Sequence, residues 1–349
     1  MSSRVLITGG AGFIGSNLAV HLLKDHDTHI IIYDNLSRRG AQLNIERLLE
    51  AHRDRVKIVK GDVRNLEMLK KAMKDVSIVF HAAAQVAVTT SITDPVTDFQ
   101  VNATGTLNVL EAIRQCQSNA ILFYTSTNKV YGDNVNAICI TEKASRYEFS
   151  DMKFKEGVPE EFPTDADEHT PYGCSKYVGD LYVRDYAIIY GLKTITFRMS
   201  CIYGPRQYGT EDQGWVAHFV ISSILGVPLT IYGDGKQVRD ILYIDDLLRA
   251  FDMAIEHINK TGGQTYNIGG GPQNTISLLE LLQHIEPLLG RHINYSFGNW
   301  RLGDQKAYYS NIGKAKRDFL WEPKISKEEG ILNLFHWVLD NREILKTIR

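Results

Sequence analysis

The sequence lacks the residue patterns that mark disulfide frameworks and metal centres. Its 349 residues include only four cysteines, with no C-x-x-C pair among Cys116, Cys139, Cys174 and Cys201. Cysteines spaced so widely favour reduced thiols in a cytoplasm over disulfide bridges or a zinc site. The eleven histidines form no H-x-x-x-H or H-E-x-x-H pattern, so we expect no metal ion.

Long apolar runs and an excess of charge of one sign are absent as well. The sequence has no apolar run of roughly 18 residues, and its start lacks the charged, apolar and cleavage regions of a signal peptide, so we expect neither a membrane span nor secretion. The net charge of −2 gives no basic footprint for nucleic acid. We therefore expect a cytoplasmic protein that holds anionic ligands with local groups.

What residues 1–200 do contain is an alternation of apolar, β-branched runs with helical patterns. Near-continuous apolar runs are typical of strands buried on both faces of a sheet, and this alternation predicts a doubly wound, parallel α/β sheet. The expected strands are 4–8, 29–34, 56–62, 77–83, 120–126 and 193–200. One expected helix, 98–115, has a stripe predicted to face inward: Phe99, Val101, Leu107, Val109, Leu110 and Ile113.

Beyond residue 200 this rhythm stops, and glycine and aromatic residues become frequent. A helix is still expected at 277–289, because Ser277 and Glu280 can form a capping box and Gly290 follows the last leucine. We expect residues 1–200 to form a cofactor-binding domain and 201–349 to form mainly a smaller, mixed α/β substrate lobe. A segment near 232–262 is expected to return to the first domain.

A glycine-rich turn follows the first expected strand. "LITGGAGFIGSNL" places Gly9, Gly12 and Gly15 between that strand and a helix, with the spacing G-x-x-G-x-x-G. Glycines let backbone N–H groups approach a pyrophosphate at the positive end of the helix. A glycine triplet alone can equally be an ordinary turn, but its position in the first strand–helix connection favours a dinucleotide.

An acidic residue, Asp34, ends the second expected strand. It can accept hydrogen bonds from adenosine ribose hydroxyls and would repel a 2′-phosphate, which favours NAD over NADP. Arg38 and Arg39 lie nearby and could hold such a phosphate, and a helix cap is the structural alternative for Asp34. Asp62, after the third strand, is expected to meet the adenine.

Tyr172 and Lys176 stand four positions apart at the start of an expected helix, so they share one face. A phenol with a pKa near 10 is too weakly acidic to act as a base, but a nearby ammonium and the positive nicotinamide ring both favour phenolate and are expected to lower that pKa. Tyr172 could then accept a proton from a substrate hydroxyl. Thr127 and Ser126, after the fifth strand, are the candidates to hold that hydroxyl.

Taken together, "TGGAGFIG", "HAAAQV", "STNKVYG", "YGCSK" and "FRMSCIYGPR" resemble the extended short-chain dehydrogenases/reductases, over nearly the whole chain. The resemblance implies a Rossmann-type domain that binds NAD, a lobe for a sugar nucleotide, and the catalytic residues Thr127, Tyr172 and Lys176. The implied cofactor-binding residues are Gly9, Gly12, Phe13, Ile14, Gly15, Asp34, Asn35, Ser37, Arg38, Asp62, Val63, Ala82, Ala83, Gln85, Asn102, Tyr172 and Lys176.

The same resemblance implies contacts with the substrate. Arg239 and Arg301 are expected to hold the diphosphate with forked hydrogen bonds, although each could instead form a surface salt bridge. The full implied set is Gln85, Thr89, Thr127, Asn128, Cys201, Arg206, Gln207, Tyr232, Arg239 and Arg301. A homo-oligomer, dimer or tetramer, is expected from the family alone.

Two details narrow the expected reaction. The family's dehydratases need an Asp–Glu pair directly after the catalytic threonine, whereas this chain has Asn128 and Lys129, so dehydration lacks its acid. The polar insert before Tyr172, together with "STNKVYGD" and "DQGWV", resembles the CDP-tyvelose (CDP-paratose) 2-epimerases. Cys201 departs from the asparagine that UDP-galactose 4-epimerases usually place there.

We therefore expect NAD-dependent C2 epimerisation of a CDP-sugar of the CDP-paratose/CDP-tyvelose type, with CDP-glucose as a further candidate. The alternatives are a 4-epimerase of the UDP-galactose type, a reductase with exchangeable NADPH, and a non-catalytic NAD-sensing protein. The presence of Thr127, Tyr172 and Lys176 argues against a non-catalytic protein.

Overall fold

The structure of the protein, a computed structural model, describes residues 3–348. Its contacts divide the chain into two compact units. Unit 1 comprises the described residues up to Val130, Pro171–Arg198 and Phe251–Tyr266, and unit 2 comprises Tyr131–Thr170, Met199–Ala250 and the described residues from Asn267 onward. The segment 131–170 thus groups with unit 2, and 251–266 is the late segment that joins unit 1.

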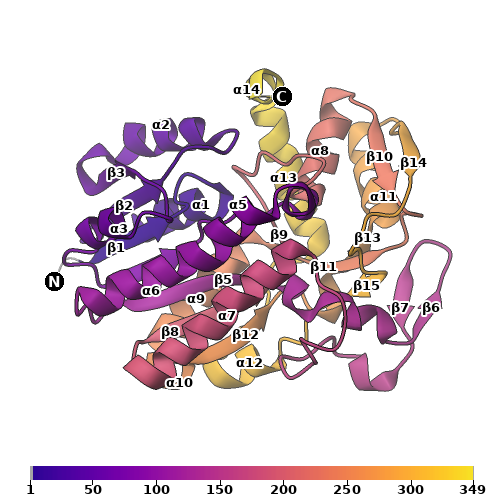
Figure 1. Cartoon of the computed structure of the whole chain (residues 1–349). Coiled ribbons are helices and arrows are strands. Elements are labelled where there is room, and N and C mark those ends of the chain that lie inside the picture. The colour runs from indigo at the N-terminus through magenta and orange to yellow at the C-terminus, as the bar shows by residue number, and fades with distance from the viewer. Residues whose placement is uncertain (1–2, 349) are drawn as a thin grey trace. The chain divides into compact units, whose positions relative to one another are not determined.

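A seven-stranded sheet forms the centre of unit 1, in the order β12-β8-β5-β4-β1-β2-β3 (Figure 1). The pairings of β1 with β2 and β4, of β2 with β3, and of β4 with β5 are parallel. The six strands expected from the sequence are present within one to two residues at most ends. The observed strands are β1 (Arg4–Thr8), β2 (His29–Asp34), β3 (Val56–Lys60), β4 (Ile78–His81), β5 (Ile121–Thr127), β8 (Thr194–Met199) and β12 (Gln264–Ile268).

The strand order reverses at β1, whose two neighbours are β2 and β4. In an open α/β sheet, ligands bind outside the carboxyl ends of the strands at such a switch point. The turn after β1 and the segment after β4 therefore meet at the position where a ligand is expected. The doubly wound α/β fold predicted from the sequence is confirmed.

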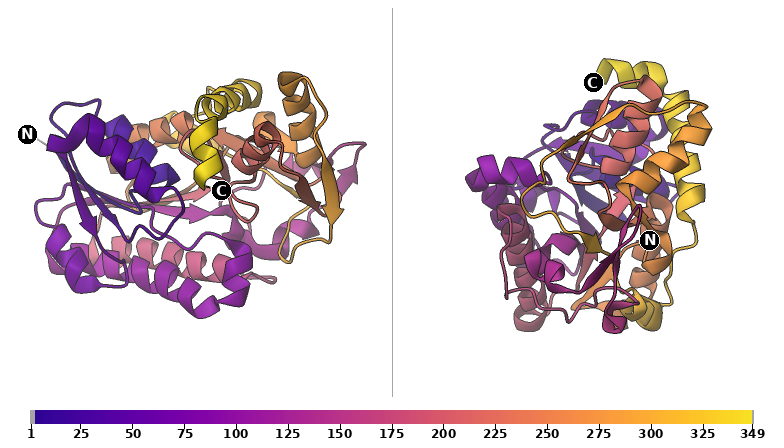
Figure 2. Two further views of the ribbon diagram at one scale, coloured as in Figure 1. Left: turned by 90° about the horizontal axis from the view of Figure 1, so that it is seen from above. Right: turned by 90° about the vertical axis from the view of Figure 1, so that its right-hand side faces the viewer.

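Helices cover both faces of this sheet, as the left view in Figure 2 shows for α1 and α2 on one side and α6 and α7 on the other. One face carries Val79, Leu122 and Tyr124, which pack with Val109 and Val183 of the covering helices. The helices of unit 1 are α1 (Phe13–Leu22), α2 (Ala41–His52), η1 (Arg53–Arg55), α3 (Leu66–Ala72), α4 (Val88–Thr93), α5 (Pro95–Phe99), η2 (Gln100–Thr104), α6 (Gly105–Gln115), α7 (Pro171–Tyr190) and α10 (Ile258–Thr261).

The helix expected over 98–115 is divided by a π-helical turn, η2, between α5 and α6. Val109, Leu110 and Ile113 are buried as predicted, and Val101 and Leu107 are partly buried against the same core. Phe99 is 51% exposed, so its predicted place in the inward stripe was wrong. A π turn changes the winding of the helix and rotates the preceding side chains away from the face that follows.

Unit 2 contains shorter strands and helices. Strand β11 (Val238–Tyr243) pairs with β13 (Thr275–Ser277), β15 (Ala307–Tyr308) and β9 (Cys201–Tyr203), and β10 (Leu229–Tyr232) pairs with β14 (Tyr295–Gly298). Helix α9 (Ile244–Glu256) continues from unit 2 into unit 1. The remaining helices are α8 (Trp215–Leu225), η5 (Pro272–Asn274), α11 (Leu278–Leu289), α12 (Gly313–Phe319), α13 (Lys327–Asp340) and α14 (Arg342–Ile348).

Local signals in this half also correspond to structure. Ser277 and Glu280 form the expected capping box at the start of α11, and Gly290 ends the helix in a left-handed conformation with φ 65°. The apolar stripe of α13 packs inward at Ile331, Leu334, Phe335 and Val338, whereas Leu339 is 43% exposed. None of the helices in the described part of the chain combines the length and apolar character needed to cross a bilayer.

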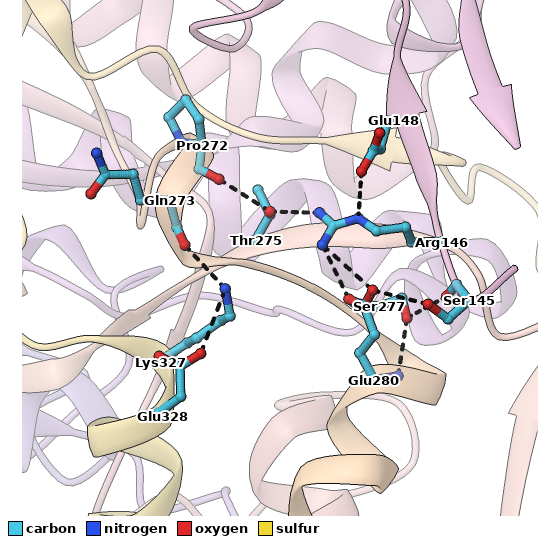
Figure 3. A network of polar contacts seen from close by, with 10 residues as sticks. All are labelled: Ser145, Arg146, Glu148, Pro272, Gln273, Thr275, Ser277, Glu280, Lys327 and Glu328. Atoms are coloured by element: carbon cyan, nitrogen blue, oxygen red, sulfur yellow. Dashed lines mark hydrogen bonds and ion pairs between the residues drawn. The ribbon is translucent and has the colours of Figure 1, made fainter. Parts of the chain in front are cut away.

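The insert before Tyr172 is an integrated part of unit 2. It begins within η3 (Asn128–Ala137) and contains the hairpin β6 (Ile140–Glu142) with β7 (Tyr147–Phe149), and η4 (Met152–Phe154). Figure 3 shows Arg146 of this insert at the centre of polar contacts with Glu280 (3.3 Å), Thr275 (2.6 Å) and Glu148 (3.4 Å). These contacts tie the insert to α11 and β13.

Candidate functional site

The glycine turn after β1 packs tightly against the segment after β4. Gly9 has φ +69°, and a Cβ there would lie 2.6 Å from the backbone nitrogen of Ala83. At Gly15 a Cβ would lie 2.5 Å from the carbonyl oxygen of Gly9. Glycine is therefore required at both positions, for the left-handed backbone at Gly9 and for close packing at both.

Gly12 is the N-cap of α1, and Phe13 and Ile14 begin the helix, whose first turn contains no acidic residue. The first N–H groups of a helix have no acceptor within it, and the helix dipole makes this end positive. The turn thus offers backbone donors and positive potential with no acidic side chain of that turn competing, which fits the pyrophosphate of a dinucleotide.

Asp34 joins the end of β2 to the glycine turn. One carboxylate oxygen accepts a hydrogen bond from the backbone N–H of Ala11 (3.0 Å), and the other accepts one from Leu36 (2.8 Å). Burial raises the pKa of Asp34, although these two hydrogen bonds oppose the shift. Each oxygen keeps a second lone pair, so the residue can still accept from ribose hydroxyls as predicted.

Asp62 lies beside Asn35 and forms an ion pair with Arg64 (2.8 Å). A hydrogen bond from Arg64 lowers the pKa of Asp62 to about 2, so this carboxylate is ionised at neutral pH. Asn35 donates to Asp62 (3.2 Å) and accepts from the backbone of Ser37 (3.0 Å). The side-chain amide of Asn108 in α6 donates a hydrogen bond to the backbone carbonyl of Val63 (3.0 Å), which connects this loop to α6.

The segment after β4 carries three predicted cofactor residues, and a fourth, Asn102 of η2, contacts it. Ala82 and Ala83 donate backbone hydrogen bonds to Thr8, which holds them beside the glycine turn. Gln85 and Asn102 exchange hydrogen bonds between the Gln85 backbone and the Asn102 side chain (2.9 and 3.0 Å). The side chain of Gln85 folds back onto Ala87 at both its donor and its acceptor.

Tyr172 lies in the first turn of α7, is buried, and has a side-chain hydrogen bond with Thr127 of β5. The structure thus brings together two predicted catalytic residues from separate parts of the chain. Ser126, the other candidate, donates instead to Asp180 (3.1 Å). Successive side chains of a strand point to opposite faces, which is why only one of the pair reaches Tyr172.

Burial raises the pKa of Tyr172 to about 12. The hydrogen bond with Thr127 and the charge of Arg38 lower the pKa, while Asp98 raises it, and burial is the largest effect. The groups of the chain alone therefore do not produce the lowered pKa that was expected for Tyr172. The cause is desolvation, which disfavours a phenolate inside a protein.

Lys176 is almost completely buried on the same helix. Its ammonium lies 4.3 Å from the centre of the Tyr124 ring. Burial lowers the pKa of Lys176 to about 7, against the opposing effect of Asp180 and Asp98, both of which favour the charged form. The ammonium therefore exchanges its proton near neutral pH, which suits a group that takes part in proton transfer.

The sequence interpretation missed the acids around this helix. Asp180 receives two hydrogen bonds from Arg198 of β8 (2.8 and 3.3 Å), and both side chains are buried. Asp98 is completely buried and accepts from Ser175 (2.5 Å). The spacing of four positions between Lys176 and Asp180 was a sequence signal for Asp180. Nothing local in the sequence indicates Asp98.

Two further residues of unit 1, Thr89 and Asn128, were predicted to contact the substrate. The hydroxyl of Thr89 is buried and makes no hydrogen bond among the described residues. A buried polar atom without a partner is costly, so a ligand group at this position would relieve that cost. Asn128 is buried and its amide oxygen accepts from the Thr127 hydroxyl (3.4 Å).

Within unit 2, both predicted phosphate-binding arginines have acidic partners. Arg239 is buried, donates to the carbonyl of Gln305 (2.7 Å) and pairs with Asp304 (2.5 Å). Arg301 lies 3.4 Å from each of Glu211 and Asp212. Phosphate binding by either guanidinium therefore competes with, or adds to, these ion pairs.

The other predicted substrate residues of unit 2 lie in loops and strand ends. The Arg301 guanidinium stacks 3.9 Å from the centre of the Tyr232 ring. Gln207 is buried with its amide oxygen unpartnered among residues 3–348, and the neighbouring Arg206 has φ +64°. Cys201 accepts a hydrogen bond from the Trp215 indole (3.3 Å).

Cys174, in the first turn of α7, is exposed. The helix is covered on the side that carries Tyr172, Ser175 and Lys176, and Cys174 lies on the other side.

The chain is similar to proteins of related activities along its whole length. It is 41% identical to the CDP-paratose 2-epimerase of Salmonella typhi, over 96% of this chain and 98% of that protein. It is 31% identical to the UDP-glucuronate 4-epimerase of Thermodesulfobacterium geofontis, over 99% of this chain and 98% of that protein.

Solved structures agree in fold. The UDP-glucose 4-epimerase of Thermotoga maritima with UDP-glucose superposes with a TM-score of 0.82 at 30% identity, covering 97% of this chain and 99% of that one. The UDP-glucuronic acid 4-epimerase of Bacillus cereus in complex with UDP-glucuronic acid and NAD gives 0.81 at 28% identity, with the same two coverages. The model of the NAD dependent epimerase/dehydratase family matches residues 5–269. The chain therefore belongs to the NAD dependent epimerase/dehydratase family, and its cofactor is NAD.

Proposed function

We propose that this protein is a nucleotide-sugar epimerase that inverts C2 of a CDP-sugar of the CDP-paratose/CDP-tyvelose type. The observation that carries the proposal is the buried group of Thr127, Tyr172 and Lys176, in a chain 41% identical to a CDP-paratose 2-epimerase. CDP-glucose is a further candidate substrate. The substrate, the reacting carbon and the roles of the individual residues are all parts of this proposal.

The chemistry of the sugar excludes the simplest route. A C2–H next to a hydroxyl, with no adjacent carbonyl, is not acidic enough to be removed as a proton at neutral pH. Epimerisation therefore requires temporary oxidation to a 2-keto sugar, which turns over in the site and is reduced on the opposite face. When bound, NAD supplies the hydride acceptor and donor, and its oxidised form supplies a positive ring.

The residues of the chain supply the proton transfer. Tyr172 accepts the proton of the C2 hydroxyl during oxidation and returns it during reduction. The Thr127 hydroxyl holds the reacting oxygen and, through its hydrogen bond, favours the phenolate. The ammonium of Lys176 stabilises that phenolate. Because the pKa of Lys176 is about 7, this ammonium can release a proton near neutral pH.

The nucleotide part of the substrate anchors the sugar while the keto intermediate turns. Arg239 and Arg301 are the proposed diphosphate contacts, since a guanidinium makes forked hydrogen bonds to phosphate. Tyr232 is the proposed contact for the base. The unpartnered polar atoms of Thr89 and Gln207 are proposed to meet sugar or nucleotide groups. A closed site retains the ketone until it is reduced.

Relatives in the family catalyse other reactions, and two of these give rival proposals. A dTDP-glucose 4,6-dehydratase of Salmonella typhimurium is 29% identical to the chain. Dehydration needs a general acid beside the catalytic threonine, and Asn128 and Lys129 do not provide one. The rival with support is 4-epimerisation, because 4-epimerases are 31% identical over nearly the whole chain.

The test is the stereochemistry of the product. CDP-paratose, CDP-glucose and UDP-glucose are incubated separately with the protein, and NMR identifies the inverted carbon. Inversion at C2 of a CDP-sugar supports the proposal, and inversion at C4 of UDP-glucose alone supports the rival. The conversion repeated in heavy water must leave the inverted centre free of deuterium, because a returned hydride does not exchange with solvent. Cofactor bound without turnover of any sugar would leave an NAD-sensing role.

A further inference from the structure

Asp98 is a completely buried carboxylate on α5 that the proposed chemistry does not use. One of its oxygens accepts a hydrogen bond from the hydroxyl of Ser175 (2.5 Å), and the other accepts one from the amide of Asn102 (3.1 Å). Ser175 precedes Lys176 on α7, and Asn102 lies in the π-helical turn that follows α5. A single buried acid therefore connects the helix that carries the proposed catalytic residues with a turn of unusual winding.

The connection continues to the backbone of Tyr172. The Ser175 hydroxyl lies 3.1 Å from the Tyr172 carbonyl oxygen, so its proton can be directed either to that carbonyl or to Asp98. The Tyr172 N–H donates to the hydroxyl of Ser91 in α4 (3.1 Å), and Ser91 in turn donates to the carbonyl of Val88 (2.7 Å). Both polar groups of the Tyr172 backbone are thus held by buried serines.

We propose that Asp98 is a positioning residue for the reaction: through Ser175 it holds the first turn of α7, and its charge keeps Lys176 in the ammonium form. The inference rests on the proposed function for its catalytic consequence, whereas the link between Asp98 and Lys176 is a property of the chain alone. A buried carboxylate is costly unless it is paired or hydrogen-bonded, and the two donors and the nearby ammonium offset that cost.

The charged and titratable groups around Asp98 and Lys176 shift one another's pKa values. Asp98 and Asp180 raise the pKa of Lys176 against burial, and Lys176 in turn lowers the pKa of His81. Burial raises the pKa of Asp98, and Ser175 and Lys176 oppose it. The groups that interact electrostatically with Tyr172, Lys176 or Asp98 are Arg38, His81, Asp94, Tyr124, Cys174, Asp180 and, through Asp180, Arg198.

The variant Asp98→Asn separates charge from shape. An asparagine can keep its oxygen toward Asn102 and turn its NH₂ toward Ser175, whose hydroxyl then donates to the Tyr172 carbonyl. All hydrogen bonds are retained in this arrangement and only the negative charge is lost. The matched control is Asp94→Asn, which makes the same charge change at the exposed N-cap of the same helix, where asparagine caps equally well.

The first measurement needs no substrate. In protein labelled with ¹³C at the lysine ε carbon, NMR follows the titration of Lys176, whose signal is assigned by its loss in Lys176→Arg. Removing a neighbouring opposite charge is expected to lower the pKa of Lys176 by about 1 unit in Asp98→Asn. Asp94→Asn is expected to leave it unchanged. An unchanged Lys176 pKa in Asp98→Asn overturns the inference.

The second measurement is the pH profile of kcat with CDP-paratose. Without the charge of Asp98 the pKa of Tyr172 also falls, so both limbs of the profile are expected to move to lower pH by about 1 unit. A merely structural loss would lower kcat and leave both limbs in place, which would contradict the proposed role of the charge. If the wild-type protein turns over no CDP-sugar while the NMR shift is present, the proposed function fails and the Asp98 link stands.

Ser175→Ala provides an independent variant should Asp98→Asn fold poorly. It retains the charge and removes the hydroxyl that joins Asp98 to α7. We expect kcat to fall about tenfold with little change in KM, because only the orientation of Tyr172 is loosened. Wild-type kcat in Ser175→Ala would remove the mechanical part of the inference.

Discussion

The hydroxyl of Tyr124 donates a hydrogen bond to the backbone carbonyl of Lys176 (3.0 Å), while the Lys176 ammonium lies 4.3 Å from the centre of the Tyr124 ring. One side chain of β5 therefore holds the helix backbone and also faces the charge carried by that helix. The ring face attracts a cation, which partly offsets the burial of the ammonium.

Tyr124→Phe keeps the ring and removes only the hydrogen bond. We expect a loss of about 1 kcal/mol in the free energy of unfolding, measured in urea, because the carbonyl keeps its partner within the helix. Tyr124→Leu also removes the ring face and is expected to lower kcat further at alkaline pH, where less Lys176 is charged. Equal kcat values for the two variants across pH would contradict a role for the ring.

Tyr172→Phe removes the proposed proton acceptor and leaves the ring in place. We expect kcat to fall by about 10²- to 10⁴-fold, with the amount of bound NAD unchanged when it is released by denaturation and measured by chromatography. Tyr182→Phe, at an exposed position on the same helix, is the matched control and should retain wild-type activity. Full activity in Tyr172→Phe would exclude the phenol from the chemistry.

Gly9→Ala tests the role of the glycine turn, and Gly191→Ala is its matched control. The two glycines have nearly the same backbone angle, φ +69° and +68°, but a Cβ at Gly9 meets the backbone of Ala82 and Ala83, whereas a Cβ at Gly191 meets nothing within 4 Å. Both variants should lose about 1–2 kcal/mol from the backbone conformation. Only Gly9→Ala should also lose more than about tenfold in NAD affinity, measured by calorimetry, because the turn must move.

Arg198→Met leaves the buried carboxylate of Asp180 without its ion-pair partner. Removing one member of a buried pair costs about 3–5 kcal/mol, and the unfolding midpoint in urea should fall accordingly. The control is Lys316→Met, whose partner Glu322 is 54% exposed and which should change stability by no more than about 0.5 kcal/mol. Similar losses in the two variants would mean that the buried pair contributes no more than the exposed one.

His81 gives a prediction for pH. Thr106 donates to the carbonyl of Asn102, so the Nε2–H of His81 donates to Thr106 and its Nδ1 accepts from Thr8. Burial lowers the pKa of His81 from 6.5 to about 3, so below pH 6.5 the unfolded chain binds the extra proton and the folded chain does not.

Stability therefore falls as pH falls through this range, and the contribution of His81 between pH 6.5 and pH 5 is about 2 kcal/mol. In His81→Gln the free energy of unfolding should depend less steeply on pH by this amount. His292→Gln, at a side chain that is 97% exposed, should keep the wild-type dependence. Parallel curves for wild type and His81→Gln would contradict the assignment of a neutral histidine.

Local patterns in the sequence were sufficient for most strands of the central sheet and for the class of protein. Apolar runs predicted six strands of the parallel sheet, and Ser277 with Glu280 predicted the start of α11, because these signals depend on neighbours within a few residues. The glycine turn, Asp34 and the spacing of Tyr172 and Lys176 indicated the family and NAD, since each is a short motif with its own chemistry.

Contacts between distant residues decided the rest. No local signal in the sequence indicates the π turn next to the exposed Phe99, the integration of the insert through Arg146, or the buried acid Asp98. The pKa of Tyr172 is the plainest case: the sequence indicated a phenol next to a lysine, but only the tertiary structure set how deeply the phenol is buried. Desolvation depends on everything packed around a group, so it is fixed by the fold and not by the spacing of two residues.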